Sequence, residues 1–306
     1  MPKGYRVHFV GLPSFAAKIA RHLSEFDSEN TYKSYDTYFS KKELVKCLLE
    51  FNKADLIYSM NGSLLPSGIF DKAIRKKIPL VMHWMGTDVL KAIKAKKDEL
   101  MLKQYAEYAH HATEVSWLQQ ELLEVDINAQ LIPYVVMTAP EEPPAWGEQF
   151  EVLTYLGKDR EKFYGWHKVR ALAKALPAIN FNIVGTQLEG EELPKNVTAH
   201  GWVNNMDEFR SRSTVLLRLT EHDGLANTVL EALSWGRYVL FTYNTPGCKR
   251  SEGVDSDARY ILELWDKFAN GPLDHNETGM NFIKENFEST KVLEGMKKFI
   301  QSVIEE

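Results

Sequence analysis

The chain has 306 residues, and its 44% hydrophobic and 26% charged content is typical of a folded globular protein rather than a disordered one. The length predicts two domains, and the net charge of −5 disfavours general nucleic-acid binding. Two cysteines, Cys47 and Cys248, exclude a disulfide framework and a cysteine zinc site. No apolar run approaches the roughly 18 residues of a membrane span. We therefore expect a cytoplasmic protein, with peripheral contact at the inner membrane face as an alternative.

Short apolar runs alternate with helical patterns through the first half of the chain. The runs that predict strands are 6–10, 31–38, 56–60, 80–84, 113–116 and 130–133. The patterns that predict helices are 15–26, 42–51, 69–76 and 89–108. Strands that alternate with helices indicate a parallel sheet covered on both faces.

A proline-rich stretch divides the chain. Residues 138–147 contain three prolines and no periodicity, and proline fixes φ and removes a donor, so this stretch indicates a stiff linker. We place an N-terminal Rossmann-like domain at 1–139, the linker at 140–149 and a C-terminal Rossmann-like domain at 150–306, with the terminal helices free to pack back on the first domain.

The second half repeats the rhythm of the first. Predicted strands are 152–156, 181–184, 197–199, 215–219 and 238–242, and predicted helices are 167–176, 206–212 and 228–235. A last amphipathic helix is indicated over 292–303 by apolar residues at helical spacing. The predicted fold class is α/β, with two Rossmann-like domains facing each other across a cleft.

The turn after the predicted strand 215–219 carries the densest chemical signal. Asp223 and Gly224 form an acidic turn, and a helix predicted to be capped near Asn227 or Thr228 follows it. Free N–H groups at a helix start form an anion site. One turn further, Glu231 offers a carboxylate suited to paired hydroxyl groups. An anion site beside such a carboxylate indicates a sugar nucleotide.

This segment resembles the donor-binding motif of the GT-B glycosyltransferases, specifically the large retaining family 4. In that family two glutamates, with seven residues between them, bracket a turn and a helix start. The second acid corresponds to Glu231, which is thereby implied to hold the ribose hydroxyls. The first is Asp223, implied to contact the transferred sugar, with Glu221 as an alternative two residues out of register. The amides implied to hold the diphosphate are those of Gly224, Leu225, Ala226 and Asn227.

Other segments are similar to the family's strand ends. Cations after the strand 152–156 are implied to hold the pyrophosphate, and turns near 185 and 203 are implied to surround the base. A histidine at a first-domain strand end is implied to face the donor sugar, and a glycine after the first strand is placed to approach the donor phosphates. These candidates are Lys158, Arg160, Lys162, Gly185, Val203, His83 and Gly11.

The resemblance implies a retaining, metal-independent glycosyltransferase. Its donor would be a nucleoside-diphosphate sugar, UDP- or GDP-linked, and its acceptor a hydroxyl of a glycan, a lipid-linked molecule or a small molecule on the first domain. No cofactor is expected. Two alternatives stay open: a sugar-nucleotide 2-epimerase of the same fold, and a non-catalytic sugar-nucleotide-binding subunit. A nicotinamide dehydrogenase is disfavoured because no full glycine fingerprint opens either half.

Two further patterns have simpler interpretations. Asp255-Ser256-Asp257 is a DxD sequence, but it lies just before a predicted helix, so we expect helix N-capping rather than metal binding. The predicted helix 89–108 carries a series of lysines, which indicate a solvated face or, alternatively, a contact with anionic lipid or a phosphate-bearing acceptor. These lysines are Lys91, Lys94, Lys96, Lys97 and Lys103.

Metal independence gives a direct test. Because no DxD lies near a predicted strand end and cations near Lys158 are available to neutralise a diphosphate, transfer activity should survive excess EDTA. The measurement is the rate of sugar transfer before and after chelation. Loss of activity that magnesium or manganese restores would contradict the prediction.

Overall fold

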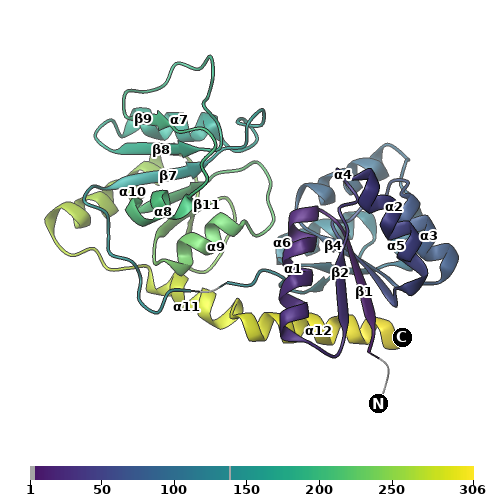
Figure 1. Cartoon of the computed structure of the whole chain (residues 1–306). Helices are drawn as coiled ribbons and strands as arrows, with labels where there is room; N and C mark the ends of the chain where they lie inside the picture. Colours follow the sequence, from purple (N-terminus) through teal and green to yellow (C-terminus); the bar gives the residue numbers. More distant parts are fainter. Residues whose placement is uncertain (1–3, 138) are drawn as a thin grey trace. The chain divides into compact units, whose positions relative to one another are not determined.

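The computed structural model describes residues 4–137 and 139–306, and these form two compact units. The first unit is Met1–Val136 with Asp223–Leu225 and Ser289–Glu306, and the second is Met137–His222 with Ala226–Glu288. Met1–Lys3, and Thr138 of the predicted proline-rich stretch, lie outside the described residues. Each unit contains one six-stranded sheet in which all the paired strands run parallel (Figure 1).

The first sheet has the strand order β2-β1-β3-β4-β5-β6. Its strands are β1 (Arg6–Gly11), β2 (Thr31–Ser34), β3 (Leu56–Met60), β4 (Leu80–Trp84), β5 (His110–Thr113) and β6 (Gln130–Leu131). The two central strands β3 and β4 are buried at every position, as strands covered on both faces must be. The order reverses between β1 and β3, which makes the carboxyl ends of these strands the ligand-binding position of a doubly wound sheet.

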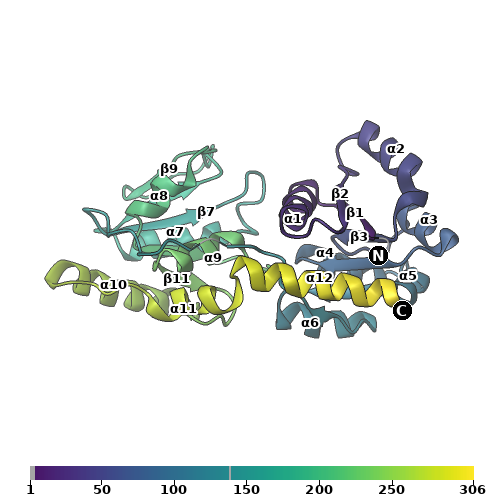
Figure 2. The same ribbon diagram turned by 60° about the horizontal axis from the view of Figure 1, so that its bottom comes forward.

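Helices cover both faces of the first sheet. They are α1 (Pro13–Phe26), α2 (Lys41–Glu50), α3 (Gly68–Lys76), α4 (Thr87–Lys97), α5 (Lys103–Tyr108), α6 (Ser116–Leu122) and α12 (Ser289–Glu305), with short 3-10 turns at Phe51–Lys53 and Leu123–Val125. Figure 2 shows α12, the C-terminal helix, lying along this unit. It buries an apolar stripe that includes Phe299, whose ring meets Tyr58 of β3 edge-on, and Lys297 pairs with the buried Asp27 at 3.1 Å.

The second sheet has the order β12-β11-β10-β7-β8-β9. Its strands are β7 (Glu151–Tyr155), β8 (Asn180–Val184), β9 (Val197–Ala199), β10 (Val215–Arg218), β11 (Tyr238–Phe241) and β12 (Cys248–Arg250). Its helices are α7 (Trp166–Ala175), α8 (Met206–Arg212), α9 (Asn227–Ser234), α10 (Val254–Asn270) and α11 (Glu277–Asn286). The strand order reverses between β7 and β10, as in a dinucleotide-binding fold. Both sheets therefore confirm the α/β prediction of two Rossmann-like domains.

Two first-unit predictions need correction. The predicted helix 89–108 is two helices, because Glu99 adopts a left-handed φ of 59° and the Leu100 amide closes α4 by donating to the Ala95 carbonyl at 2.8 Å. The predicted strand 113–116 lies three residues earlier, at β5. There His111 is satisfied inside the unit by Trp84 and by the Ala106 carbonyl, so a polar residue sits in a buried strand. None of the helices in the described ranges is long and apolar enough to cross a membrane.

Candidate functional site

A pocket of about 470 Å³ lies at the carboxyl ends of β7, β8 and β9 in the second unit, and we call it the β7–β9 pocket. Its volume falls within the roughly 300–1,000 Å³ of small-molecule sites. Its lining residues are Lys158, Asp159, Glu161, Trp166, Gly185, Thr186, Gln187, Leu188, Glu189, Glu191, Gly201 and Trp202. Two of them, Lys158 and Gly185, are donor-site candidates from the sequence, and they come from different strand ends.

Gly185 is required where β8 turns into the pocket. Its φ is +97°, and an added Cβ would lie 2.4 Å from the Leu156 carbonyl oxygen, closer than real Cβ contacts allow. Its amide donates to the Gly201 carbonyl at 2.7 Å, and the Gly201 amide donates to the Thr186 carbonyl at 3.2 Å. The turns after β8 and β9 are therefore tied together as one wall of the pocket.

A second wall is organised around Glu161, which also lines the pocket. One of its carboxylate oxygens accepts the Thr186 hydroxyl at 2.8 Å and the Asp159 amide at 3.1 Å, and Thr186 in turn accepts the Leu188 amide at 3.2 Å. Burial alone would raise the pKa of Glu161, but hydrogen bonds from its own amide, Thr186 and Asp159, with the Lys158 charge, together lower it. The carboxylate is thus held ionised and in place.

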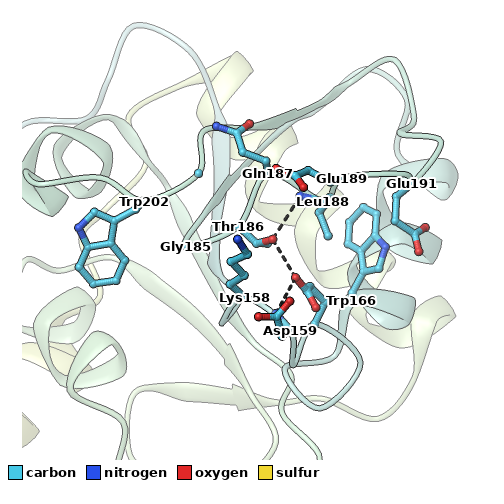
Figure 3. Close-up of a pocket in the computed structure, with 12 residues that line it drawn as sticks. Lys158, Asp159, Trp166, Gly185, Thr186, Gln187, Leu188, Glu189, Glu191 and Trp202 are labelled. Atoms are coloured by element: carbon cyan, nitrogen blue, oxygen red, sulfur yellow. Dashed lines mark hydrogen bonds between the residues drawn. The ribbon is translucent and has the colours of Figure 1, made fainter. Parts of the chain in front are cut away.

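The pocket also has one large aromatic side chain in solvent. Trp202 is 76% exposed in the turn after β9, whereas Trp166, on another side of the pocket, is buried. In Figure 3, Trp202 extends on the opposite side of the view from Trp166 and Glu191, with Lys158 between them. An exposed indole can stack on a planar ring. The ammonium group of Lys158, which lines the same pocket, can bind a negatively charged group attached to that ring.

The start of α9 lacks a side-chain cap. The predicted cap at Asn227 or Thr228 is wrong, because the N-cap position is Ala226, which has no side-chain hydrogen bond. The Oδ1 atom of Asn227 and the Oγ1 atom of Thr228 are buried without a hydrogen-bond partner. The first turn of a helix also has amides without intrahelical partners. The donors that this end of α9 can offer to an anion are its first-turn amides and the Thr228 hydroxyl, whereas the Asn227 Oδ1 atom can only accept.

Glu231, one turn into α9, has a partner that the sequence did not reveal. Its carboxylate bonds to the guanidinium of Arg210 on α8, and this guanidinium also bonds to Asp207. The Arg210 side chain is buried and lies over the Trp235 ring at 5.1 Å. Because Arg210 occupies one oxygen of Glu231, a ligand hydroxyl would share the carboxylate with the arginine.

The remaining second-unit candidates do not line the pocket. The Arg160 guanidinium lies over the Phe163 ring at 4.3 Å, and Lys162 is exposed. Val203 is half-buried, one residue beyond the pocket residue Trp202. The structure therefore brings Lys158 and Gly185 together at one pocket and leaves these three outside its lining.

A second pocket, of about 310 Å³, lies in the first unit where the strand order reverses, and we call it the β1–β4 pocket. It is lined by Leu12, Tyr38, Asn61, Gly62, Ser63, Leu64, Leu65, Met85, Thr87, Asp88, Lys91 and Ala92. Asp88 organises it, because its buried carboxylate accepts the amides of Gly62, Met85, Gly86 and Val89 at 2.8 to 3.1 Å. Burial raises the pKa of Asp88 although these amides oppose the shift.

The first-domain candidates take two different positions. Gly11 ends β1 with a φ of +93°, and an added Cβ would lie 2.5 Å from the Asn61 Oδ1 atom, so only glycine fits beside the pocket. His83 is fully buried in β4, and its Nδ1 atom lies 2.8 Å from the Tyr58 hydroxyl while its Nε2 atom has no partner. Burial lowers the pKa of His83 to about 3. Its imidazole is therefore neutral within the core.

The predicted motif is divided between the two units. Asp223, Gly224 and Leu225 group with the first unit, whereas Ala226, Asn227 and Glu231 group with the second. The predicted roles of all six stay predictions.

Similarity to solved structures was found along nearly the whole chain. HepE from Anabaena, solved with UDP-glucose, has a TM-score of 0.71 at 11% identity, covering 97% of this chain and 100% of its own. Sucrose-phosphate synthase from Thermosynechococcus elongatus also has a TM-score of 0.71 at 11% identity, covering 98% and 99%. A glycosyltransferase from Rickettsia africae has a TM-score of 0.67 at 11% identity, with the same coverage. No protein-family model and no curated protein sequence matches the chain.

These structures have GT-B architecture. The chain has the GT-B fold. The fold part of the resemblance stated from the sequence is thereby confirmed, at identities too low to carry an activity. The β7–β9 pocket lies at the carboxyl ends of strands of the second sheet, and the β1–β4 pocket lies at the carboxyl ends of strands of the first.

The DxD sequence has a structural role. The N-cap of α10 is Gly253, so the predicted capping by these aspartates is wrong. The buried Asp257 instead accepts the Glu252 amide at 3.1 Å from within the first helical turn. In residues 4–137 and 139–306, no three His, Cys, Asp or Glu side chains gather in a group that could hold a metal ion.

The buried His83 predicts a pH dependence of stability. It stays neutral in the folded chain because its pKa is about 3, but in the unfolded chain it takes up a proton below about pH 6.5. The unfolded state thus binds more protons, and the stability present above that pH is lost as pH falls. The loss from this residue is about 2 kcal/mol between pH 7 and pH 5.

The measurement is urea unfolding at pH 7, 6 and 5 for the parent, His83→Gln and the exposed-site control His167→Gln. Between pH 7 and pH 5, the free energy of unfolding should fall by about 2 kcal/mol less in His83→Gln than in the parent. The control should lose as much as the parent does. An unchanged pH dependence in His83→Gln would show that His83 is protonated in the folded chain.

Proposed function

We propose that this protein is a glycosyltransferase that takes its sugar from a nucleoside-diphosphate sugar, with the nucleotide in the second unit. The observation that carries the proposal is the β7–β9 pocket, which lies at strand carboxyl ends in the unit that also contains Glu231. The solved structures of HepE with UDP-glucose and of the pneumococcal O-GlcNAc transferase GtfA with UDP support a uridine nucleotide. GDP is the alternative expected from the sequence.

In this proposal the base stacks on the exposed Trp202 indole. The turn at Gly185, which lines the pocket, is proposed to offer the backbone groups left outside its hydrogen bond with Gly201 to the edge of the base. The hydrogen bond between Glu161 and Thr186 holds the pocket wall in place before a ligand binds. Binding therefore costs little conformational entropy of the pocket residues. Uracil and guanine differ in their hydrogen-bonding edges, and backbone groups here can discriminate between them.

The diphosphate is proposed to lie between Lys158 and the start of α9. Negative charge grows on this group as the sugar leaves, so fixed positive and N–H groups there lower the barrier. The Lys158 ammonium lines the pocket, and the uncapped first turn of α9 adds oriented amides. We propose retention of configuration without a metal ion. The donor phosphate would take the acceptor's proton, and no protein nucleophile is assigned.

Glu231 is proposed to bind the ribose hydroxyls with Arg210 as its positioning residue. The guanidinium neutralises the carboxylate and fixes its orientation through Asp207 and the Trp235 ring. The other carboxylate oxygen of Glu231 is proposed to accept the ribose hydroxyls. Asp223 keeps its predicted contact with the transferred sugar, whereas His83 is fully buried and is given no contact with it in this proposal.

Trp202 provides the first test. Stacking of a base on an aromatic side chain is worth about 1–3 kcal/mol, so Trp202→Ala should weaken nucleoside-diphosphate binding about 5- to 100-fold. Trp202→Phe should recover most of the affinity. The matched control is Trp265→Ala, which removes the partly exposed indole of α10. The affinities are measured by calorimetric titration with UDP and with GDP. If Trp202→Ala binds both nucleotides as tightly as the parent does, the base does not stack on Trp202.

Glu231 provides the second test. Hydrogen bonds to a charged group contribute about 1.5–3 kcal/mol, so Glu231→Ala should lower UDP affinity about 10- to 100-fold. With 2′,3′-dideoxy-UDP the parent and Glu231→Ala should bind equally, because the ribose hydroxyls are gone. Glu263→Ala, at an exposed position of α10, is the matched control.

Asp223→Ala should differ from Glu231→Ala in its UDP affinity when both are measured by the same titration. It is predicted to touch the transferred sugar, so kcat should fall while UDP affinity stays within about threefold of the parent. Equal UDP affinity in Glu231→Ala and the parent, with normal folding, would refute the ribose assignment.

A further inference from the structure

The first unit presents one helix face made only of lysine and aliphatic side chains. Five positions of α2 are exposed: Lys41, Lys42, Val45, Lys46 and Leu49. Val45 is 54% exposed and Leu49 is 79% exposed, one helical turn apart on the same face. The helix also carries two half-buried acidic residues: a carboxylate oxygen of Glu43 lies 3.7 Å from the ammonium of Lys46, and Glu50 accepts Lys33 and Tyr35. The solvent face therefore combines apolar surface with positive charge.

Two aromatic side chains continue this face before the helix begins. Phe39 is 82% exposed and Tyr38 is 53% exposed. The segment is ordered, because the Asp36 carboxylate accepts the amides of Tyr38 and Phe39 at 3.0 and 2.8 Å, and the Ser40 hydroxyl caps α2. Figure 2 shows α2 at the outer margin of its unit. The α2 patch consists of Tyr38, Phe39, Lys41, Lys42, Val45, Lys46 and Leu49.

The α2 patch adjoins the β1–β4 pocket through Tyr38, which lines that pocket. The pocket wall carries the polar side chains of Asn61, Ser63 and Lys91 beside apolar ones, including Leu65, which is 37% exposed. A pocket with both polar and apolar walls, next to an apolar and basic surface, is suited to a molecule with a polar head and an apolar tail.

We propose that the α2 patch docks the first unit on an anionic lipid surface and that a lipid-linked acceptor is presented from this surface to the β1–β4 pocket. Phe39, Val45 and Leu49 enter the boundary between headgroups and acyl chains, while the lysines extend to the lipid phosphates. The docking step stands on the α2 patch alone. The acceptor assignment rests on the proposed glycosyltransferase function.

Size and charge favour a lipid surface over a protein partner. Stable protein interfaces bury about 800 Å² on each side, and four partly exposed apolar side chains offer less than this, since even a whole aromatic buries only about 150–250 Å². Interface centres are also depleted in lysine, whereas three of the seven residues of the α2 patch are lysines.

The lysine-rich α4 is a weaker docking surface. Lys94 pairs with Asp98 at 2.6 Å, and Lys96 pairs with Asp126 at 2.7 Å, so two of its lysines are held in close ion pairs. The α2 patch has one such pair, Lys46 with Glu43, at the longer distance of 3.7 Å. Leu90 on this helix is only 39% exposed. The lipid contact expected from the sequence at 91–103 is therefore assigned instead to α2.

The test is vesicle flotation of the full chain with phosphatidylcholine vesicles that contain or lack phosphatidylglycerol. The parent should float with the anionic vesicles and not with the neutral ones, and the bound fraction should fall as salt rises. Phe39→Ser/Leu49→Ser and Lys41→Glu/Lys42→Glu should each lower vesicle partitioning about tenfold or more, because each removes one of the two contributions. Leu123→Ser, at a position 57% exposed in the same unit, and Lys94→Glu are the matched controls.

Thermal unfolding and UDP titration of every variant should match the parent, which separates failed docking from failed folding or failed donor binding. Parent-like flotation of both α2 variants would overturn the proposal, as would loss of flotation in Lys94→Glu alone. Self-association of the lipid-free parent in sedimentation, abolished by Phe39→Ser/Leu49→Ser, would assign the patch to a second copy instead. Normal flotation without UDP binding would leave docking intact and refute the donor proposal.

Discussion

All the paired strands in both sheets run parallel, and this constraint determines where chemistry can occur. A parallel strand must be followed by a crossover, so the turns that leave the carboxyl ends collect at one edge of each sheet. The two pockets at these edges are built by groups that fix the turns. Gly185 allows the backbone to approach Leu156 in the second unit, and Asp88 gathers four amides in the first.

The accuracy of the sequence predictions follows burial. β3 and β4 were predicted to the residue, because a continuously buried strand in a parallel sheet is a continuous apolar run. The break between α4 and α5 was missed, since Glu99 takes a left-handed conformation that its residue type does not announce. The three-residue β12 was missed because two of its three residues are charged. The positions of short strands and polar strands are set by their contacts with neighbouring elements. The hydrophobic periodicity of the sequence carries no information about these contacts.

The site shows the same division. Lys158 and Gly185 were found because each follows a recognisable strand, and the structure brings them to one pocket. Trp202 lies in a turn that the sequence predicts to be near the base. Because a turn has no hydrophobic periodicity, the sequence does not indicate whether an aromatic residue there is exposed. Arg210 was missed for a different reason. Its pairing with Glu231 spans 21 residues and depends on how α8 and α9 pack within the second unit.

Exposed apolar side chains are distributed unevenly between the two units. Among the described residues, ten of the thirteen large exposed apolar side chains lie between Phe26 and Leu131, and three lie in the second unit. One of those three is Trp202, at the β7–β9 pocket. The second unit thus exposes little apolar surface beyond its pocket, which agrees with the water-soluble nucleotide proposed as its ligand. The first unit keeps Phe39 and Leu49 exposed, at 82% and 79%, so neither side chain contributes to its core, and their clustering indicates an interaction surface. An anionic lipid surface offers an apolar boundary together with phosphate groups, and this is the combination that the proposed docking of α2 requires.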